Sequence, residues 1–425
     1  MKVKNLRWFI VSLVALATII NYIDRTALTV MWPSIAEDMG FTDHDYANIM
    51  SVFLVAYAIG QATFGKIFDA VGTRIGFILS IVVWSVSIAL HAVATSVASF
   101  SVFRVLLGFG EAGNWPGATK ANAEWFPVKE RALAQGIFGA GASIGGIVSP
   151  PLVALLYAYL GWQATFIVIA SFGFIWLIPW LILYKAGPDA HPWITEEERD
   201  YILTGQKVEI EDGKEEYVPT LKELLSHRQS WGVIFARFFM EPIWWLFVAY
   251  LPLYLNDKFG FNIKDIGASA WIPYVGAALG ALVGGWLSGR LIGNGWSINK
   301  ARKTVITIGG LIMLPALIAT SVAATPAAAL TLITVILFGF QFTINNVQTL
   351  PSDFFSGKSV ASLAGISGAV GVISVITAIQ LVPFITNGGE NYLPFFIFGA
   401  ALVPLLLAAV WFICGTIKPV EAKTH

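Results

Sequence analysis

The chain has 425 residues, of which 56% are hydrophobic and 12% are charged, with 26 basic and 26 acidic side chains. Because a soluble globular protein carries roughly 25% charged residues, this composition indicates a protein embedded in lipid. The net charge of zero gives no indication of a nucleic-acid partner. The single cysteine, Cys414, excludes an internal disulfide, and the 5 scattered histidines have no metal-ligand spacing, so we expect no metal site.

Long apolar segments divide the chain into two similar halves. A membrane-spanning helix needs about 20 mostly apolar residues, and a longer polar segment, residues 186–229, separates two sets of six candidates. We therefore predict an all-α membrane protein with twelve transmembrane helices: a six-helix bundle over 1–185, a linker over 186–229 and a second bundle over 230–425. The candidate spans lie near 9–31, 46–68, 75–96, 98–123, 131–159, 163–184, 230–255, 266–291, 303–323, 326–350, 359–386 and 393–415.

Basic residues gather on one side of this predicted arrangement. Lys and Arg accumulate in the cytoplasmic loops of membrane proteins, whereas the opposite side offers only Lys258 and Lys264. We therefore expect both termini and the linker in the cytoplasm. Within the linker, Thr195 and Glu198 have the spacing of a capping box, which predicts a short surface helix that ties the halves together.

Ionisable residues inside the predicted spans are the main functional signal. A charge near the bilayer centre costs roughly 2.5–3.5 kcal/mol on insertion scales, so such residues usually face an internal cavity. Asp24 and Arg25 point to neighbouring but different faces of one helix. Arg104 and Glu111 lie two turns apart, about 10 Å along the axis, and share a face. Both helices can therefore turn a mixed acidic and basic surface toward a common cavity.

Such a surface can couple a proton to an anion. Desolvation favours the neutral form of a buried acid, and a nearby cation favours the ionised form. Arginine stays charged and grips a carboxylate with two parallel hydrogen bonds. Protonation of Asp24 would release Arg25 for an anionic substrate, and each ligand would then favour binding of the other. The alternative is a structural ion-pair network that only holds helices together.

A short motif between the second and third spans resembles a known family. GKIFDAVGTR, with Gly65, Asp69, Gly72 and Arg74, is similar to the signature loop of the major facilitator superfamily. Small residues there let two helices approach closely, and the polar residues can bind neighbouring helix ends. A weaker copy, GWLSGRLIGNGWSINKARK, occupies the equivalent place in the second half and lacks the acid of the first. The resemblance covers nearly the whole chain and implies the fold of that superfamily.

Further stretches resemble one branch of it, the anion:cation symporters. NYIDR (21–25), RVLLGFGEAGNWPG (104–117) and EWFPVKERALAQGIF (124–138) carry this resemblance. RFFMEPIWWLFVAYLPLYL (237–255) and TLPSDFF (349–355) look most like the bacterial hexuronate members, which carry galacturonate or glucuronate inward with protons. In those relatives the acid before the proline is often Asp, whereas this chain has Glu241, which implies a deeper or reshaped pocket.

The resemblance implies roles for the charged residues. Asp24 and Glu111 would bind protons, and Arg25 would bind the substrate carboxylate. Arg104 would be a second cation of the substrate site that holds Glu111 or Asp24. Lys120, at the inner end of the fourth span, is expected to extend toward the cytoplasm instead of binding substrate.

Neutral side chains would bind the hydroxyls of a sugar acid. Buried amides are costly unless satisfied, so the amide cluster in the tenth span is either a helix contact or a hydroxyl-binding surface. Trp244 either stacks on a sugar face or packs against lipid or a neighbouring side chain. Glu241 is a third protonatable site, a hydroxyl acceptor or a partner of Arg237. The hydroxyl-binding candidates are Tyr22, Tyr57, Asn345, Asn346 and Gln348.

These inferences predict a proton-coupled symporter that imports an acidic sugar, a hexuronate such as galacturonate or glucuronate, by alternating access. We expect it in the bacterial inner membrane as a monomer, with protons as the coupling ion, no other cofactor and no nucleic-acid partner. The alternatives are a symporter of another organic anion, such as an aldonate or aldarate, and a transporter-like ligand sensor. No nucleophile–base pair or phosphate-binding glycine loop in the sequence indicates an enzyme.

Overall fold

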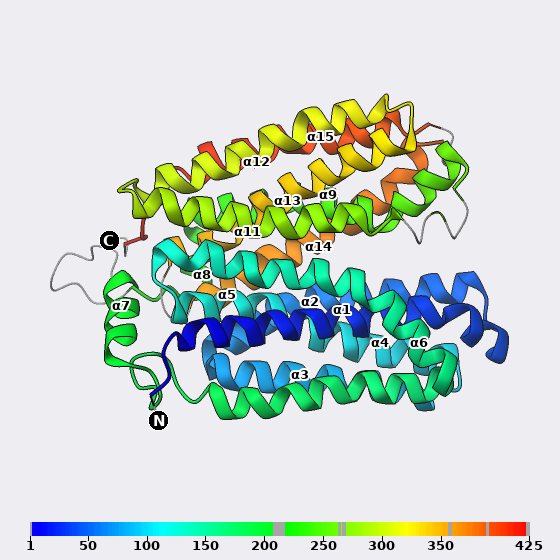
Figure 1. The fold of residues 1–425 in the computed structure, drawn as a ribbon, viewed down its shortest axis with the longest axis horizontal. Coiled ribbons are helices and arrows are strands. Elements are labelled where there is room, and N and C mark those ends of the chain that lie inside the picture. The colour runs from blue at the N-terminus through cyan, green and yellow to red at the C-terminus, as the bar shows by residue number, and fades with distance from the viewer. Residues whose placement is uncertain are drawn as a thin grey trace. The chain divides into compact units, whose positions relative to one another are not determined.

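The computed structural model describes residues 2–206, 217–261, 265, 269–355, 359–387 and 391–421. Residues 207–216 of the expected linker and 266–268 of the expected eighth span lie outside this part of the chain. The described part is helical throughout, apart from its turns and one parallel bridge between Val3 and Ile194 (Figure 1). The helices are α1 Leu6–Met39, α2 Asp43–Val71, α3 Thr73–Leu90, η1 His91–Val93, α4 Val97–Glu111, α5 Asn114–Trp125, α6 Val128–Leu183, α7 Glu196–Gln206, α8 Leu221–Ser226, α9 Arg228–Phe259, α11 Ile272–Gly293, α12 Ile298–Ser321, α13 Pro326–Phe354, α14 Val360–Ile385, α15 Leu393–Ala408 and η3 Ala409–Ile413.

The predicted membrane helices are present in the structure. Among the described residues, ten helices are long and apolar enough to cross a membrane. The expected spans 131–159 and 163–184 both lie in α6. Gly161, with φ 74°, interrupts the helical backbone between them, so α6 consists of two successive helical segments. The expected span 98–123 is divided into α4 and α5, which are separated by Ala112 and Gly113. These two differences account for the twelve predicted spans and confirm the all-α membrane fold.

The chain folds into two compact units, and each takes a helix end from the other half of the sequence. Unit 1 comprises Met1–Pro127, Gly141–Lys207 and Val360–Ala369. Unit 2 comprises Val128–Ala140, Val208–Ser359 and Val370–His425. The beginning of α6 therefore belongs to unit 2, and the beginning of α14 belongs to unit 1.

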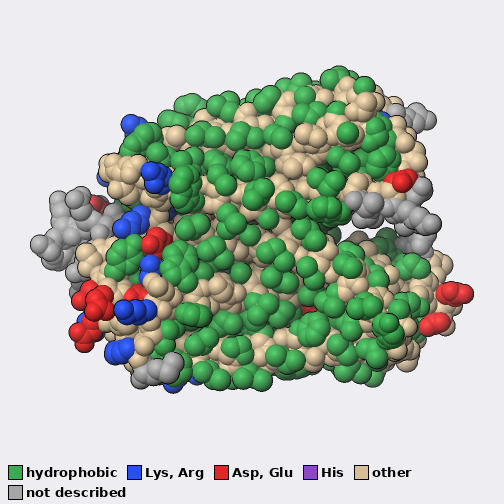
Figure 2. Space-filling view, viewed as in Figure 1, with side chains coloured by type: hydrophobic (Ala, Val, Ile, Leu, Met, Phe, Trp, Pro, Cys, Tyr) green, Lys and Arg blue, Asp and Glu red, His purple; other side chains and the backbone are tan. Residues whose placement is uncertain are grey.

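The surface of unit 1 is suited to lipid. Phe9, Ile59 and Ile178 expose 54%, 59% and 59% of their surface, far more than water-soluble proteins allow for large apolar side chains in such number. Figure 2 shows hydrophobic side chains along the helices of this unit, with charged side chains gathered near α7. This distribution is that of a helix bundle surrounded by acyl chains.

Glycine shapes the region of the signature loop in unit 1. Gly72 separates α2 from α3, and its φ of 82° would strain any other residue. A Cβ atom at Gly65 would lie 2.4 Å from the carbonyl oxygen of Ala361. One at Gly365 would lie 2.3 Å from the carbonyl oxygen of Gln61. These glycines allow α2 and the start of α14 to pack closely, and they place the end of α2 beside the α14 N-terminus.

Candidate functional site

A buried ion pair joins α1 and α4 inside unit 1. Arg25 Nε and Nη2 donate to Glu111 Oε2 at 3.2 and 3.1 Å. Arg25 Nη2 also donates to Asn21 Oδ1, one turn earlier, at 3.3 Å. The sequence predicted that Asp24 would be the counter-ion of Arg25, and the structure gives it Glu111 instead. Consecutive helix residues point about 100° apart, so Asp24 and Arg25 face different neighbours.

Aromatic rings surround the Arg25 guanidinium. Its carbon lies 5.3 Å from the centroid of Tyr22, 5.5 Å from Phe53 and 4.7 Å from Tyr57. A desolvated guanidinium over such rings gains cation–π attraction of roughly 1–2 kcal/mol. Tyr22 and Tyr57, predicted as hydroxyl ligands, thus lie beside the arginine that was predicted to bind the carboxylate.

Several buried polar atoms near the pair have no hydrogen-bond partner among the described residues. They are Asp24 Oδ1, Glu111 Oε1 and all three guanidinium nitrogens of Arg104. Arg104 is 0% exposed, and its charge acts on both acids, but it makes none of the holding hydrogen bonds that the sequence predicted. Buried polar groups are normally satisfied, so these atoms have capacity for a polar ligand. No group of three or more His, Cys, Asp or Glu side chains in the described ranges can hold a metal ion.

The signature loop forms a second charged cluster in unit 1. Asp69 accepts a hydrogen bond from Lys120 Nζ at 2.8 Å. It also accepts from the backbone N–H groups of Ala361 and Ser362 at 3.3 and 2.6 Å, where the start of α14 favours a negative charge. Lys120 is only 4% exposed, so the prediction that it extends to the aqueous phase is wrong; Asp69 holds it inside. Arg74 Nη2 donates to the carbonyl of Leu181 at 3.2 Å.

The amide cluster of α13 lies within unit 2. Asn346 Nδ2 donates to the carbonyl of Gly284 on α11 at 3.3 Å, and Asn345 Nδ2 donates to the carbonyl one turn before it at 2.6 Å. Gln348 Oε1 accepts from Gln135 Nε2 at 2.8 Å. The contacts of Asn345 and Asn346 therefore use their amide donors. The Oδ1 atoms of Asn345 and Asn346 have no partner in the described part of the chain, and such oxygens can accept from a hydroxyl.

Two further candidates in unit 2 have protein partners. Trp244 is 4% exposed and packs against Phe340 and Tyr274, with ring centroids 5.5 and 5.7 Å apart. Glu241 accepts from Arg237 Nε at 3.1 Å, which is the ion-pair alternative among its three predicted roles. Packing and ion pairing are thus the observed environments of these two side chains.

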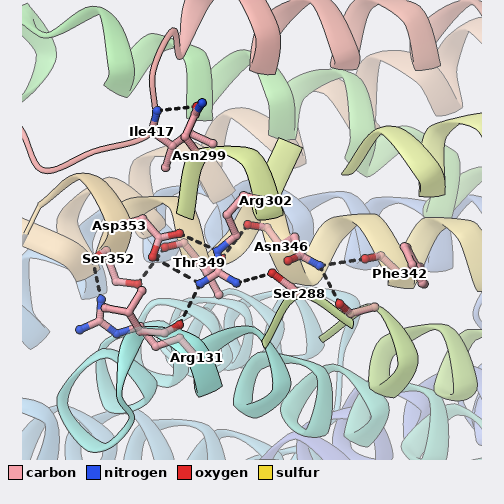
Figure 3. Close-up of polar contacts among 12 residues, drawn as sticks. Arg131, Ser288, Asn299, Arg302, Phe342, Asn346, Thr349, Ser352, Asp353 and Ile417 are labelled. Atoms are coloured by element: carbon pink, nitrogen blue, oxygen red, sulfur yellow. Dashed lines mark hydrogen bonds and ion pairs between the residues drawn. The ribbon is translucent and has the colours of Figure 1, made fainter. Parts of the chain in front are cut away.

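Sequence reasoning missed a buried ion pair in unit 2 (Figure 3). Arg302 donates through Nε and Nη2 to Asp353 at 2.8 and 3.4 Å, through Nη1 to Ser288 Oγ at 2.7 Å, and through Nη2 to the Val128 carbonyl at 3.2 Å. Both charged side chains are 0% exposed. The second signature-like loop lacks an acid, and Asp353 at the end of α13 supplies one. The only signal was the acid in TLPSDFF, which no local pattern connects to Arg302.

Curated transporters are similar to this chain over most of its length. The hexuronate transporter of Escherichia coli (strain K12) is 35% identical over 364 residues, which cover 85% of this chain and 83% of that protein. The galacturonate transporter of Dickeya chrysanthemi is 35% identical over 315 residues, 74% of this chain and 90% of that protein. The probable galactarate/D-glucarate transporter of Bacillus subtilis (strain 168) is 31% identical over 73% of this chain and 71% of that protein.

Solved structures agree with the fold. The Escherichia coli fucose:proton symporter aligns with a TM-score of 0.72 and 12% identity, covering 96% of this chain and 98% of that one. A human organic anion transporter aligns with a TM-score of 0.71 and 15% identity, covering 95% and 99%. At these identities the likeness shows the fold alone. The Major Facilitator Superfamily profile matches residues 14–379, and with these sequence identities it shows that the chain is a multi-pass transporter that belongs to the Major Facilitator Superfamily.

Proposed function

We propose that this chain is a proton-coupled symporter that imports a hexuronate, galacturonate or glucuronate, by alternating access. The proposal places it in the bacterial inner membrane as a monomer with both termini in the cytoplasm. It is supported by the two relatives at 35% identity, whose names specify a hexuronate and galacturonate. It is also supported by the charged cluster buried in unit 1.

The observation that carries the proposal is the pairing of Arg25 with Glu111. A carboxylate of a sugar acid is chemically equivalent to the Glu111 carboxylate, and a guanidinium binds either one through the same donors. We propose that protonation of Glu111 removes its negative charge, after which the substrate carboxylate takes its place at Arg25. This assigns to Glu111 the exchange step that the sequence alone suggested for Asp24.

Charge balance supports coupling to protons. The ionised acids Asp24 and Glu111 balance the cations Arg25 and Arg104, so the cluster is neutral as a whole. A monoanionic sugar acid would leave a buried negative charge, which is costly in a low dielectric. One proton taken up with the anion restores neutrality, and the two ligands then favour each other reciprocally. Asp24, with its unpartnered oxygen, is the second proton acceptor in this proposal.

Candidate substrate ligands occur within each unit taken by itself. In unit 1, Tyr22 and Tyr57 lie against Arg25 and bring phenol hydroxyls beside the proposed carboxylate position. In unit 2, the oxygens of Asn345 and Asn346, which have no partner in the described part of the chain, would accept hydroxyls. Gln348 would contribute its amide nitrogen, because its oxygen accepts from Gln135. Trp244 and Glu241 shape this region through their contacts with neighbouring side chains.

A second candidate cargo is an aldonate or aldarate. Relatives at 30–31% identity carry names that specify galactonate and galactarate/D-glucarate. The Arg25–Glu111 exchange works for any carboxylate, so cargo choice depends on the hydroxyl ligands. A dianionic aldarate would need two protons to keep the unit 1 cluster neutral, one on Glu111 and one on Asp24.

Transport assays in proteoliposomes test the proposal. We expect labelled galacturonate or glucuronate to accumulate only when the pH outside is lower than inside, and a protonophore to abolish accumulation. Glu111→Gln should remove the dependence on the gradient, whereas Glu197→Gln, an exposed acid on α7, should leave it intact. Accumulation without a gradient would refute symport. Faster uptake of galactonate or galactarate than of either hexuronate would favour the second candidate.

A further inference from the structure

The N-terminus of α1 has no capping side chain of its own. Asn5 at the N-cap makes no side-chain cap bond, and the first turn has no acid. Glu198 of α7 fills this role from 192 residues along the chain. Its Oε2 accepts the N–H of Leu6 at 2.9 Å, and its Oε1 accepts the N–H and Nη1 of Arg7 at 3.2 and 2.8 Å. These are charge-assisted bonds at the positive end of a helix, where an acid is most stabilising.

Glu198 has been diverted from the capping box that its sequence spacing predicts. Thr195 Oγ1 accepts the Glu198 N–H at 3.3 Å, so α7 begins where that spacing indicates. In a complete box the acid would return to the N–H of Thr195. Here its two oxygens are directed to the start of α1, and the side chain is 7% exposed.

The other end of α7 binds a second helix end of unit 1. Gln206 Nε2 donates to the carbonyls of Ala123 and Glu124 at 3.2 and 2.6 Å, at the end of α5. The last carbonyls of a helix have no partner within it, so a donor there completes the helix. α7 thus supplies an acceptor to one helix start and a donor to one helix end. Figure 1 shows α7 beside the N-terminal part of the chain.

These two helix ends lead to the two partners of the buried ion pair. Helix α1 is continuous from Leu6 to Arg25. Glu111 is the last residue of α4, and the chain continues through two residues into α5. Because a helix transmits axial displacement along its length, the position of each end affects the register of Arg25 against Glu111. Shifts near 1 Å suffice to disrupt a site of this kind.

We propose that α7 is a positioning clamp for the transport site, with Glu198 and Gln206 as its positioning residues. This inference rests on the proposed role of Arg25 and Glu111 and adds the linker helix to the determinants of substrate affinity. Arg25 and Glu111, which form the ion pair, lie on α1 and α4. In this proposal α7 fixes the axial position of these helices through its contacts with the start of α1 and the end of α5.

Uptake kinetics of three variants test the clamp. Glu198→Ala should raise KM for the hexuronate roughly threefold to tenfold, the size expected when a helix cap is lost. Glu198→Gln keeps one of the two acceptor oxygens and turns an NH2 group toward the other backbone N–H, so KM should lie between those of the wild type and Glu198→Ala. Glu197→Ala, on the exposed side of α7, should leave KM unchanged. A purely structural role would lower the amount of folded transporter and hence Vmax; unchanged KM in Glu198→Ala would overturn the proposal.

Amide hydrogen exchange gives a readout that needs no substrate. In Glu198→Ala, exchange should increase at residues 6–10 and also at 21–25, around the ion pair. If exchange increases only at 6–10, Glu198 caps α1 without positioning the site, and the clamp is refuted. Gln206→Ala is the second variant, and it should increase exchange at residues 108–114. It tests the clamp independently if the Glu198→Ala variant fails to fold. Because no cargo is involved, a wrong choice of sugar leaves this outcome unaffected.

Discussion

Each unit buries an arginine–carboxylate pair, and the two pairs differ in how completely their surroundings satisfy them. In unit 2, Arg302 makes four hydrogen bonds, to Asp353, Ser288 and the Val128 carbonyl. In unit 1, the Arg25–Glu111 pair lies in a cluster where one carboxylate oxygen of Glu111 and three nitrogens of Arg104 have no partner among the residues that the structure describes. A satisfied buried network fixes one arrangement, whereas a partly satisfied one is costly unless something else binds it.

From this difference we infer a structural role for the unit 2 pair, and we propose a functional one for the unit 1 pair. Sequence position does not distinguish them, since both consist of arginine and an acid inside helices. The number of hydrogen-bond donors and acceptors that have no partner among the described residues distinguishes the two pairs. Arg302 has little capacity for a further carboxylate, while the cluster of Asp24, Arg104 and Glu111 retains both donors and acceptors. We therefore expect substitutions in the two pairs to affect different properties of the protein.

The largest expected effect is on folding, at the satisfied pair. Arg302→Met leaves the Asp353 charge buried and unpaired, which should cost about 3–5 kcal/mol of stability. The double variant Arg302→Met/Asp353→Leu removes both charges and should recover most of this loss. Thermal unfolding in detergent measures both. Unfolding of Arg302→Met at the wild-type temperature, with a raised KM, would mean that the unit 2 pair is functional as well.

Next in size is the loss of affinity at the partly satisfied pair. Arg25→Lys keeps a positive charge beside Glu111 but loses the planar fork, so affinity for a hexuronate should fall about 100-fold while the protein still folds. The matched control is Arg290→Lys, at an exposed position on α11. Uptake KM and thermal unfolding separate the two effects. Unchanged affinity would remove Arg25 from the substrate site.

The effect of Asp24→Asn on proton-driven accumulation should be smaller than the loss of affinity in Arg25→Lys. With one proton carried per anion, a gradient of one pH unit supports roughly tenfold accumulation, since a factor of ten corresponds to 1.4 kcal/mol. Asp24→Asn should still exchange internal for external sugar but should bring accumulation down to about equal concentrations. Asp200→Asn, at an exposed acid of α7, is the control. Full accumulation by Asp24→Asn would refute its proton role.

The smallest expected effect is pH sensitivity next to α7. Burial, with Lys185 and Lys2 nearby, lowers the pKa of His191. Its Nε2 donates to the Leu183 carbonyl and its Nδ1 accepts the Trp193 N–H, so the neutral ring fits this site. The stability that it contributes is therefore present above the ordinary histidine pKa of about 6.5 and is lost as pH falls below it.

Hydrogen exchange at residues 2–8 measures this effect, because the Trp193 carbonyl accepts the N–H of Val3 at 2.7 Å. After correction for intrinsic rates, exchange there should rise a few-fold between pH 7.5 and 5.5, about what one protonation step gives. Residues around Asp353 are the internal reference. His191→Asn should abolish the difference between the two pH values. The same pH response in that variant would exclude His191 as its source.

Local patterns in the sequence were sufficient for the fold. Each membrane helix is an apolar run whose composition and length determine that it spans lipid, whatever its neighbours are. The signature loop is also local, because Gly72 ends one helix and starts the next within a single turn. The start of α7 directly after Thr195 follows from capping within four residues. The family resemblance rested on contiguous stretches of this kind.

Partners were decided by the tertiary structure. Arg25 and Glu111 are 86 residues apart, and Glu198 and Leu6 are 192 apart, so helix packing alone determines that they meet. Sequence reasoning chose Asp24 for Arg25, returned Glu198 to its own helix and left Asp353 without a role. The physical reason is that hydropathy and capping act over one or two turns of the chain. An ion pair in a membrane instead depends on which faces two helices turn toward each other, and that depends on the packing of every neighbour.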